Sequence, residues 1–105
     1  MNGEESAWPP DGERIDIDLG DDHLLAFAEY EGERSGASVW HRKADGSICA
    51  GWIAFEGRAW ARSFTGNPIA TWKIEQEDPL TLSPSLLCRA CGDHGFVRGG
   101  RWVRA

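Results

Sequence analysis

The chain has 105 residues, of which 41% are hydrophobic and 27% charged, a composition typical of one soluble globular domain. No apolar run approaches the roughly 20 residues of a membrane-spanning helix, and the acidic N-terminus lacks the basic and apolar parts of a secretory signal, so we expect a cytoplasmic protein with no membrane partner. The formal net charge of −6 is unevenly spread, because most of the acidic groups lie in the first third of the chain.

The chain starts with a segment that cannot form a core of its own. Residues 1–13 combine acidic and small residues with Pro9 and Pro10, and Trp8 is their one large aromatic group. This composition predicts a flexible acidic tail, ordered only if Trp8 docks or if a partner or a second copy of the chain holds it. Residues 14–105 are expected to form a single zinc-stabilised β domain.

Strand patterns follow in close succession. Residues 14–19 alternate strictly between polar and apolar side chains, which indicates a half-buried strand. The length of the next apolar segment and the glycines after it favour a strand over a short helix at 23–30. Four more short segments are bounded by Asp-Gly, Glu-Gly and Gly-Asn-Pro sequences, which are typical of turns between strands. These further predicted strands cover residues 37–43, 48–55, 58–64 and 69–76.

The end of the chain predicts turns and a small hairpin. Pro79 and Pro84 favour extended or turn backbone between them, and Gly99-Gly100 divides residues 95–104 into two short strands. No long amphipathic helix is visible. The predicted fold class is therefore mainly β, a small antiparallel sheet or meander of about six to eight short strands, pinned by a zinc-ribbon-like site.

One predicted hairpin brings two metal-binding residue types together. Ala44-Asp45-Gly46 is typical of a three-residue hairpin loop in which Gly46 takes the left-handed conformation of a G1 bulge. That register places His41 directly opposite Cys49. Directly paired residues have Cβ atoms about 4.5–5.5 Å apart on one face of the sheet, a separation that suits two ligands of one tetrahedral zinc ion.

A second pair of ligands lies near the end of the chain. Cys88 and Cys91 are two residues apart and precede Gly92, a spacing typical of zinc knuckles, and disulfides are not expected in a reducing compartment. His94 follows three residues after the second thiol and is the alternative to His41. In the metal-free interpretation, Cys49 is instead a small core residue and His41 a surface histidine. We predict Zn2+ held by His41, Cys49, Cys88 and Cys91.

The patterns of catalytic sites are missing, so we expect no enzymatic activity. A redox pair at Cys88 and Cys91 would need a helix N-terminus beside a parallel sheet. A zinc nuclease site at Asp93 and His94 would need a following helix with further ligands, and the chain ends too soon for one. The carboxylates gather in the N-terminal third instead of converging on either pair.

Tryptophans and arginines supply candidate binding surfaces. The hairpin register places Trp40 and Trp52 opposite the metal face, where they form either core or interface. The C-terminal arginines could contact nucleic acid, but the net charge of −6 favours a protein partner. A homodimer of the chain is a further alternative. The residues expected to bind the partner, on loops organised by the zinc, are Arg89, Asp93, Phe96, Arg98 and Trp102.

The stretch PLTLSPSLLCRACGDHGFVRGGRW carries a resemblance. It resembles a family of short, uncharacterised actinobacterial bacteriophage proteins that end in a similar Leu-Ser-Pro-Ser, Cys-x2-Cys-Gly, His-Gly-Phe and Gly-Arg-Trp series. The similarity is clearest over residues 79–104 and looser around 41–53 and 72–78. It implies a phage product in the cytoplasm of an infected bacterium, and it marks Cys88, Cys91, His94 and Trp102 as motif positions without a known role.

These observations lead to one functional expectation and one alternative. We expect a small zinc-binding phage protein that binds a host macromolecule, most directly a host protein, in host takeover or counter-defence. The alternative is a nucleic-acid-binding zinc ribbon that uses the arginine-rich C-terminal hairpin.

Overall fold

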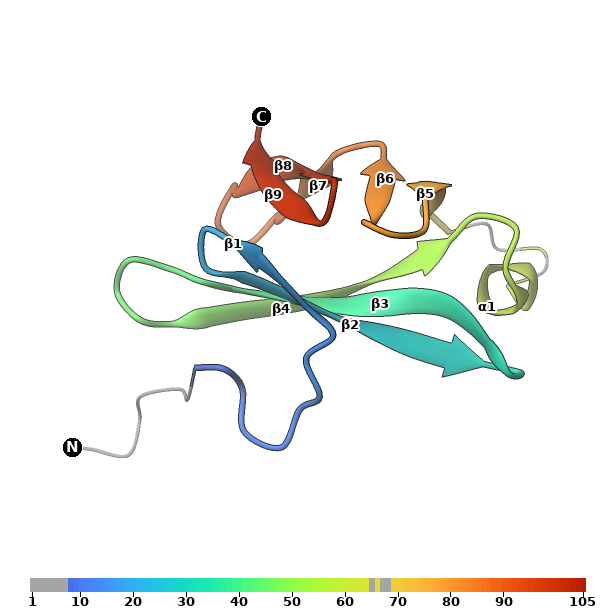
Figure 1. The fold of residues 1–105 in the computed structure, drawn as a ribbon, viewed down its shortest axis with the longest axis horizontal. Helices are drawn as coiled ribbons and strands as arrows, with labels where there is room; N and C mark the ends of the chain where they lie inside the picture. Colours follow the sequence, from blue (N-terminus) through green and yellow to red (C-terminus); the bar gives the residue numbers. More distant parts are fainter. Residues whose placement is uncertain (1–7, 65, 67–68) are drawn as a thin grey trace.

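A computed structural model describes residues 8–64, 66 and 69–105, and shows a mainly β protein built from two sheets (Figure 1). The predicted fold class is therefore confirmed. The six-stranded sheet contains, in spatial order, β1 (Ile17–Gly20), β2 (His23–Tyr30), β3 (Glu33–Arg42), β4 (Ile48–Phe55), β5 (Thr71–Gln76) and β6 (Thr81–Ser83). The three-stranded sheet contains β7 (Leu86–Leu87), β8 (His94–Arg98) and β9 (Arg101–Arg104). The described residues include no helix long and apolar enough for a membrane span.

The six-stranded sheet is antiparallel except at one junction, where β4 and β5 run parallel. Parallel neighbours cannot be joined by a tight hairpin, so the chain has to cross over between them. The crossover contains α1 (Ala59–Arg62), and the predicted strand at 58–64 is therefore wrong. Trp60 explains the difference: its ring packs 4.7 Å from that of Trp52 and covers Gly36, and these tertiary contacts override the local strand pattern.

The main core lies between the two sheets. The larger sheet curls, so that β5 and β6 lie over the face of β1–β4 beside the smaller sheet (Figure 1). The smaller sheet is fastened to this curl by backbone contacts, since the Gly100 N–H donates to the Leu80 carbonyl at 2.8 Å. The buried apolar side chains of this core are Leu19, Leu25, Ala37, Ile53, Phe55, Leu80, Leu82, Leu86, Val97 and Trp102.

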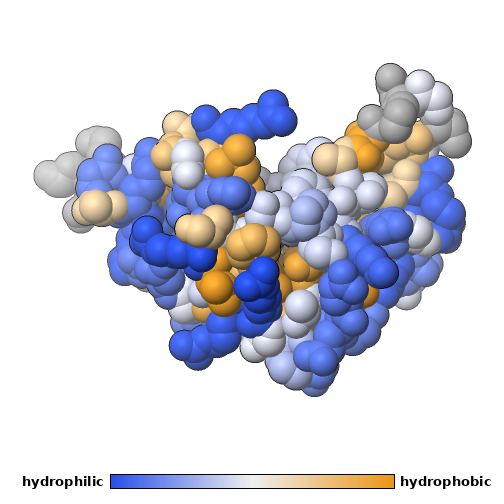
Figure 2. Space-filling view, turned by 90° about the horizontal axis from the view of Figure 1, so that it is seen from above, coloured by the Kyte–Doolittle hydropathy of each residue, from blue (hydrophilic) through white to orange (hydrophobic). Residues whose placement is uncertain are grey.

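A smaller cluster covers the opposite face of the larger sheet. Leu24, Ala26 and Trp40 are buried there, and Trp8 packs against them. Trp40 is therefore core, whereas Trp52 stays 55% exposed beside Trp60. Trp8 thus docks as the sequence allowed, while the rest of the predicted tail, residues 1–7, lies outside the described residues. Hydrophilic side chains cover most of the surface seen in Figure 2, with apolar patches between them.

Candidate metal centre

The β3–β4 hairpin has the predicted register. The Lys43 N–H donates to the Ser47 carbonyl at 2.8 Å, and Gly46 takes a positive φ of 88°, as a G1 bulge requires. His41 and Cys49 are consequently direct cross-strand partners. Their side chains leave the same face of the sheet, toward the smaller sheet.

The loop between β7 and β8 folds tightly around its two cysteines. The Gly92 N–H donates to the Cys88 carbonyl at 2.7 Å, and the Cys88 N–H donates to the Asp93 carbonyl at 2.8 Å. Gly92 has a φ of 83°, in the left-handed region that a residue with a Cβ avoids. This turn brings the thiols of Cys88 and Cys91 to one side of the loop.

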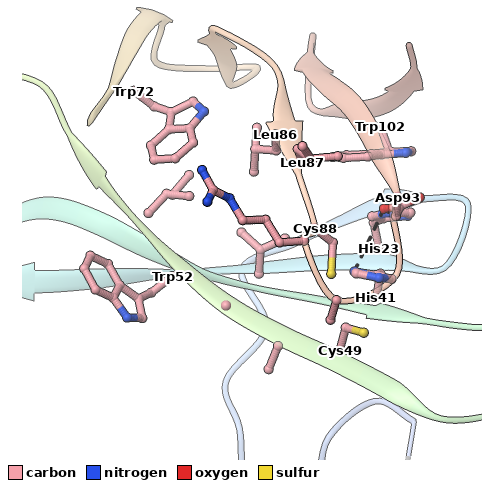
Figure 3. A pocket seen from close by; sticks show the side chains of 16 residues that line it. His23, His41, Cys49, Trp52, Trp72, Leu86, Leu87, Cys88, Asp93 and Trp102 are labelled. Carbon is pink, nitrogen blue, oxygen red and sulfur yellow. Dashed lines mark hydrogen bonds and ion pairs between the residues drawn. The ribbon is translucent and has the colours of Figure 1, made fainter. Parts of the chain in front are cut away.

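Hairpin and loop meet, and their four ligand atoms form one cluster. One ligand atom from each of His41, Cys49, Cys88 and Cys91 lies within 4.8 Å of the others, and Nε2 of His41 is 3.1 Å from Sγ of Cys91. Figure 3 shows three of these residues, His41, Cys49 and Cys88. Three thiols and an imidazole match the donors that metal ions of the zinc type prefer, and the four residues are those that the sequence spacing singled out. The structure thus contains a Cys/His cluster suited to a metal ion.

His94, the alternative fourth ligand, does not join this cluster. Its Nε2 lies 2.8 Å from Oγ of Ser85, and the side chain is exposed on β8. It is paired in the sheet with Leu87, whereas the loop cysteines turn toward the larger sheet. Among the described residues, the imidazole that faces the thiols is that of His41.

The electrostatics of the cluster favour a bound cation. Burial, together with the neighbouring thiols of Cys88 and Cys91, raises the pKa of Cys49 to about 11. Burial also acts to raise the pKa of Cys88, but the N–H groups of Cys91 and Ala90 outweigh it, so this pKa lies below its usual value. The Cys88 thiol therefore ionises more readily than a free thiol. The second and third negative charges in the same small volume require a cation to offset their repulsion.

His41 is held in the protonation state that a ligand needs. Burial lowers its pKa below 6.5, and the carboxylate of Asp93 only partly opposes this effect. The neutral imidazole offers a lone pair at Nε2, toward the thiols. Nδ1 of the same ring lies 3.9 Å from Oδ2 of Asp93, on the side away from Cys91.

A second group of polar side chains lies directly behind His41. His23 is its neighbour across β2 and β3, and Nε2 of His23 is 2.6 Å from Oδ2 of Asp93. Nδ1 of His23 donates to the Asp21 carbonyl at 2.6 Å, because a carbonyl can only accept. Trp102 stacks on the His23 ring at 4.0 Å. The His41 imidazole is thus backed by a buried histidine and a carboxylate.

The pairing of His23 with His41 does not follow from the local sequence pattern. The β2–β3 pairing contains an irregularity after Ala28, which shifts the register by one residue, so counting back from the Glu31-Gly32 turn does not align His23 with His41. The β3–β4 hairpin has no such irregularity, so counting from its loop correctly pairs Cys49 with His41.

The residues expected to bind a partner are divided by the structure. Trp102 is only 9% exposed and belongs to the core, because it sits on the inward face of β9 across from Val97. Asp93 is engaged with His23. Phe96 and Arg98 lie on the outward face of the smaller sheet, where the guanidinium of Arg98 stands 4.0 Å from the Phe96 ring centroid. Arg89 is exposed on the cysteine loop.

Fold and site together define a small two-sheet β protein with a Cys/His cluster at the junction of the sheets. Comparison of the chain with models of protein families, with curated proteins and with solved structures finds no match. What can be inferred about its function comes from the geometry of the site and its surroundings.

Proposed function

We propose that this chain is a small zinc-binding protein whose metal is structural and which acts by binding a partner protein. The observation that carries the proposal is the clustering of four protein ligand atoms within 4.8 Å of one another. Three cysteines and one histidine fill the tetrahedral shell of zinc, whereas catalytic zinc sites keep one position for water or substrate. The donor set supports a role in stability and gives no support to one in catalysis.

The position of the cluster explains what such a metal would stabilise. Two ligands come from the β3–β4 hairpin of one sheet, and two come from the β7–β8 loop of the other. A bound ion would link the sheets at the end of their shared apolar core. Structural zinc contributes about 10–16 kcal/mol of apparent binding free energy in small zinc domains, which is comparable to the whole stability of a domain of this size.

The proposed partner-binding activity is supported by exposed groups beside the site. Phe96, Arg98 and the 38% exposed Val103 lie together on the outer face of the smaller sheet, and Arg89 projects from the cysteine loop. Aromatic and arginine side chains carry most of the binding energy in protein interfaces. With the resemblance to phage proteins, this surface supports a host protein as the partner inside the infected cell.

The experiment is affinity capture from bacterial lysate with the zinc-loaded chain, followed by measurement of binding to each purified candidate partner. The double variant Phe96→Ala and Arg98→Ala is expected to lose the partner while it keeps its zinc content and melting temperature. Lys73→Ala, which removes a cation on the larger sheet, serves as the matched control.

The nucleic-acid alternative has a different signature. Binding to DNA or RNA that weakens steeply as salt rises would favour the arginine-rich hairpin as a phosphate-binding surface. One of its arginines is already engaged, because Nε of Arg104 donates to Asp21 at 2.9 Å. A gel-shift titration at two salt concentrations separates the alternatives.

A further inference from the structure

The edge of β4 that faces the smaller sheet is largely open. β4 pairs with β3 from Ile48 to Ala54, but it pairs with β5 only at Ala54 and Phe55. Within the described part of the chain, residues 48–53 have no strand on that second edge. Three consecutive residues there, Ala50, Gly51 and Trp52, are exposed.

The hydrogen-bond pattern identifies which backbone groups this edge presents. Residues of an antiparallel pair bond directly at every second position. The bond from the Lys43 N–H to the Ser47 carbonyl sets the phase, so the odd-numbered residues of β4 bond to β3. The even-numbered residues point the other way, as the Glu56 N–H does when it donates to the Trp72 carbonyl of β5. Ala50 and Trp52 therefore direct their N–H and C=O groups outward.

This edge forms one wall of a cleft. The cleft has a volume of about 310 Å³, and five consecutive residues of β4, 49–53, face β7 and the start of the cysteine loop, residues 86–90, across it (Figure 3). The second wall includes β7, which is itself the edge strand of the smaller sheet. Trp72 and Val39 contribute apolar surface to the lining.

Each wall also leaves a large apolar side chain in solvent. Trp52 of β4 is 55% exposed and Leu87 of β7 is 57% exposed. The two charged residues of the lining differ in their engagement: Asp93 is paired with His23, whereas Arg89 makes no ion pair with any described residue. The cleft thus offers unpaired strand backbone, apolar walls and one available cation.

We propose that this cleft binds an extended peptide segment of the partner protein, which adds as a strand to the open edge of β4 and places an acidic side chain against Arg89. Outward-directed N–H and C=O groups are satisfied best by another extended backbone, and adjoining apolar pockets then select alternate side chains. The inference rests on the proposed function, since it requires a protein partner.

The test uses a library of random linear 12-residue peptides displayed for selection on the zinc-loaded full chain. Selected peptides are made synthetically, labelled with fluorescein and titrated by fluorescence anisotropy. We expect them to alternate apolar residues and to contain one Asp or Glu. Ala50→Pro removes one outward N–H and should weaken binding about tenfold, because one hydrogen bond to the peptide is lost. The fold should be kept, because proline is tolerated on a strand edge where the N–H faces away from the ladder. Ala50→Val keeps the N–H and is the matched control.

Two further measurements do not depend on that variant. N-methylation of alternate peptide bonds in the selected peptide should abolish its binding to the unaltered protein. Arg89→Glu should weaken binding to the acidic peptide. Replacing the acidic residue of the peptide by lysine should restore binding to this variant. Zinc content is checked for each variant, because both positions adjoin cysteines of the cluster.

Several results would overturn the inference. The peptide experiments would do so if no binding peptide were recovered, or if binding were indifferent to both N-methylation and charge reversal at Arg89. Single-stranded nucleic acid as the occupant would also overturn it. So would a dimer, detected by analytical ultracentrifugation, in which a second copy of the chain closes the β4 edge. A partner protein that depends on Phe96 and Arg98 but not on Ala50 or Arg89 would leave the proposed function intact and remove the cleft from it.

Discussion

Nε2 of His41 lies 3.1 Å from Sγ of Cys91, although 50 positions separate the two residues in the chain. This contact joins β3 of the larger sheet to the cysteine loop of the smaller sheet. A metal ion held between them would therefore report directly on the docking of the two sheets.

Zinc content and stability should be coupled. Protein purified without chelators is expected to contain one zinc per chain by elemental analysis, and Cys88→Ser should lose the metal and melt at a lower temperature, because the ion is lost as a link between the sheets. Ala90→Ser, an exposed change in the same loop, should keep both properties. An unchanged melting temperature for the cysteine variant would contradict a structural metal.

The two candidate histidines should behave differently. His41→Ala is expected to weaken metal binding strongly, whereas His94→Ala should leave it unchanged, since His94 contacts Ser85 outside the cluster. The intensity and position of the absorption bands of bound Co2+ distinguish tetrahedral Cys3His coordination from its loss. Weaker cobalt binding in the His94 variant alone would exchange the assignments.

Asp93 should affect metal affinity without contacting the metal. Its carboxylate stands behind Nδ1 of His41 and is braced by His23, an arrangement that orients a ligating imidazole. Asp93→Asn is expected to reduce zinc affinity about 10-fold or more, measured by competition with a chromophoric chelator. Asp22→Asn removes a nearby carboxylate that pairs with Arg42 and should leave the affinity unaltered.

Replacement by alanine should affect stability differently at the two strand glycines, Gly36 and Gly51. A Cβ at Gly36 would lie 2.4 Å from the Ile53 carbonyl oxygen and 2.8 Å from the Trp60 ring, whereas a Cβ at Gly51 would meet nothing within 4 Å. We expect Gly36→Ala to lower the free energy of unfolding by about 1–3 kcal/mol and Gly51→Ala to have little effect. Urea denaturation measures both, and equal stabilities would show that the Ile53 backbone and α1 both move aside at no cost.

Asp16 should make stability depend on acid pH. Burial acts to raise its pKa, but hydrogen bonds from the Phe27 N–H and Arg14 outweigh this, and the pKa lies below 3.8. A lowered native pKa stabilises the fold above pH 3.8, and this contribution is lost as the pH falls through the native pKa. Asp16→Asn should therefore lower the free energy of unfolding by about 1 kcal/mol at pH 7 and by less near pH 3.

The matched control for this pH dependence is Asp11→Asn, an exposed carboxylate that makes no hydrogen bond with any described residue. Its unfolding curves should coincide with those of the unaltered protein at both pH values. If Asp16→Asn showed the same deficit at pH 3 as at pH 7, a lost packing contact would replace the charge as the cause.

Local rules were enough for much of the fold and for the four residues of the Cys/His cluster. Polar–apolar alternation, segment length and turn residues predicted most of the strands because they are local properties of the chain. Ala44-Asp45-Gly46 predicted the pairing of His41 with Cys49 because a short loop leaves one register. The spacing of Cys88 and Cys91 likewise implied a shared ligand pair. None of these inferences needed a contact distant in sequence.

Long-range packing decided the rest. Residues 59–62 form α1, in which the Trp60 ring packs over Gly36 of the neighbouring strand. Trp102 is part of the core, where it stacks on His23 of the other sheet. The open edge of β4 exists because β5 joins it for only two residues, and no sequence period records where a neighbouring strand stops. Local sequence determined strands, turns and ligand pairs through short-range sterics and hydrogen bonding, while the docking of the two sheets alone determined which pairs meet and which backbone is left exposed.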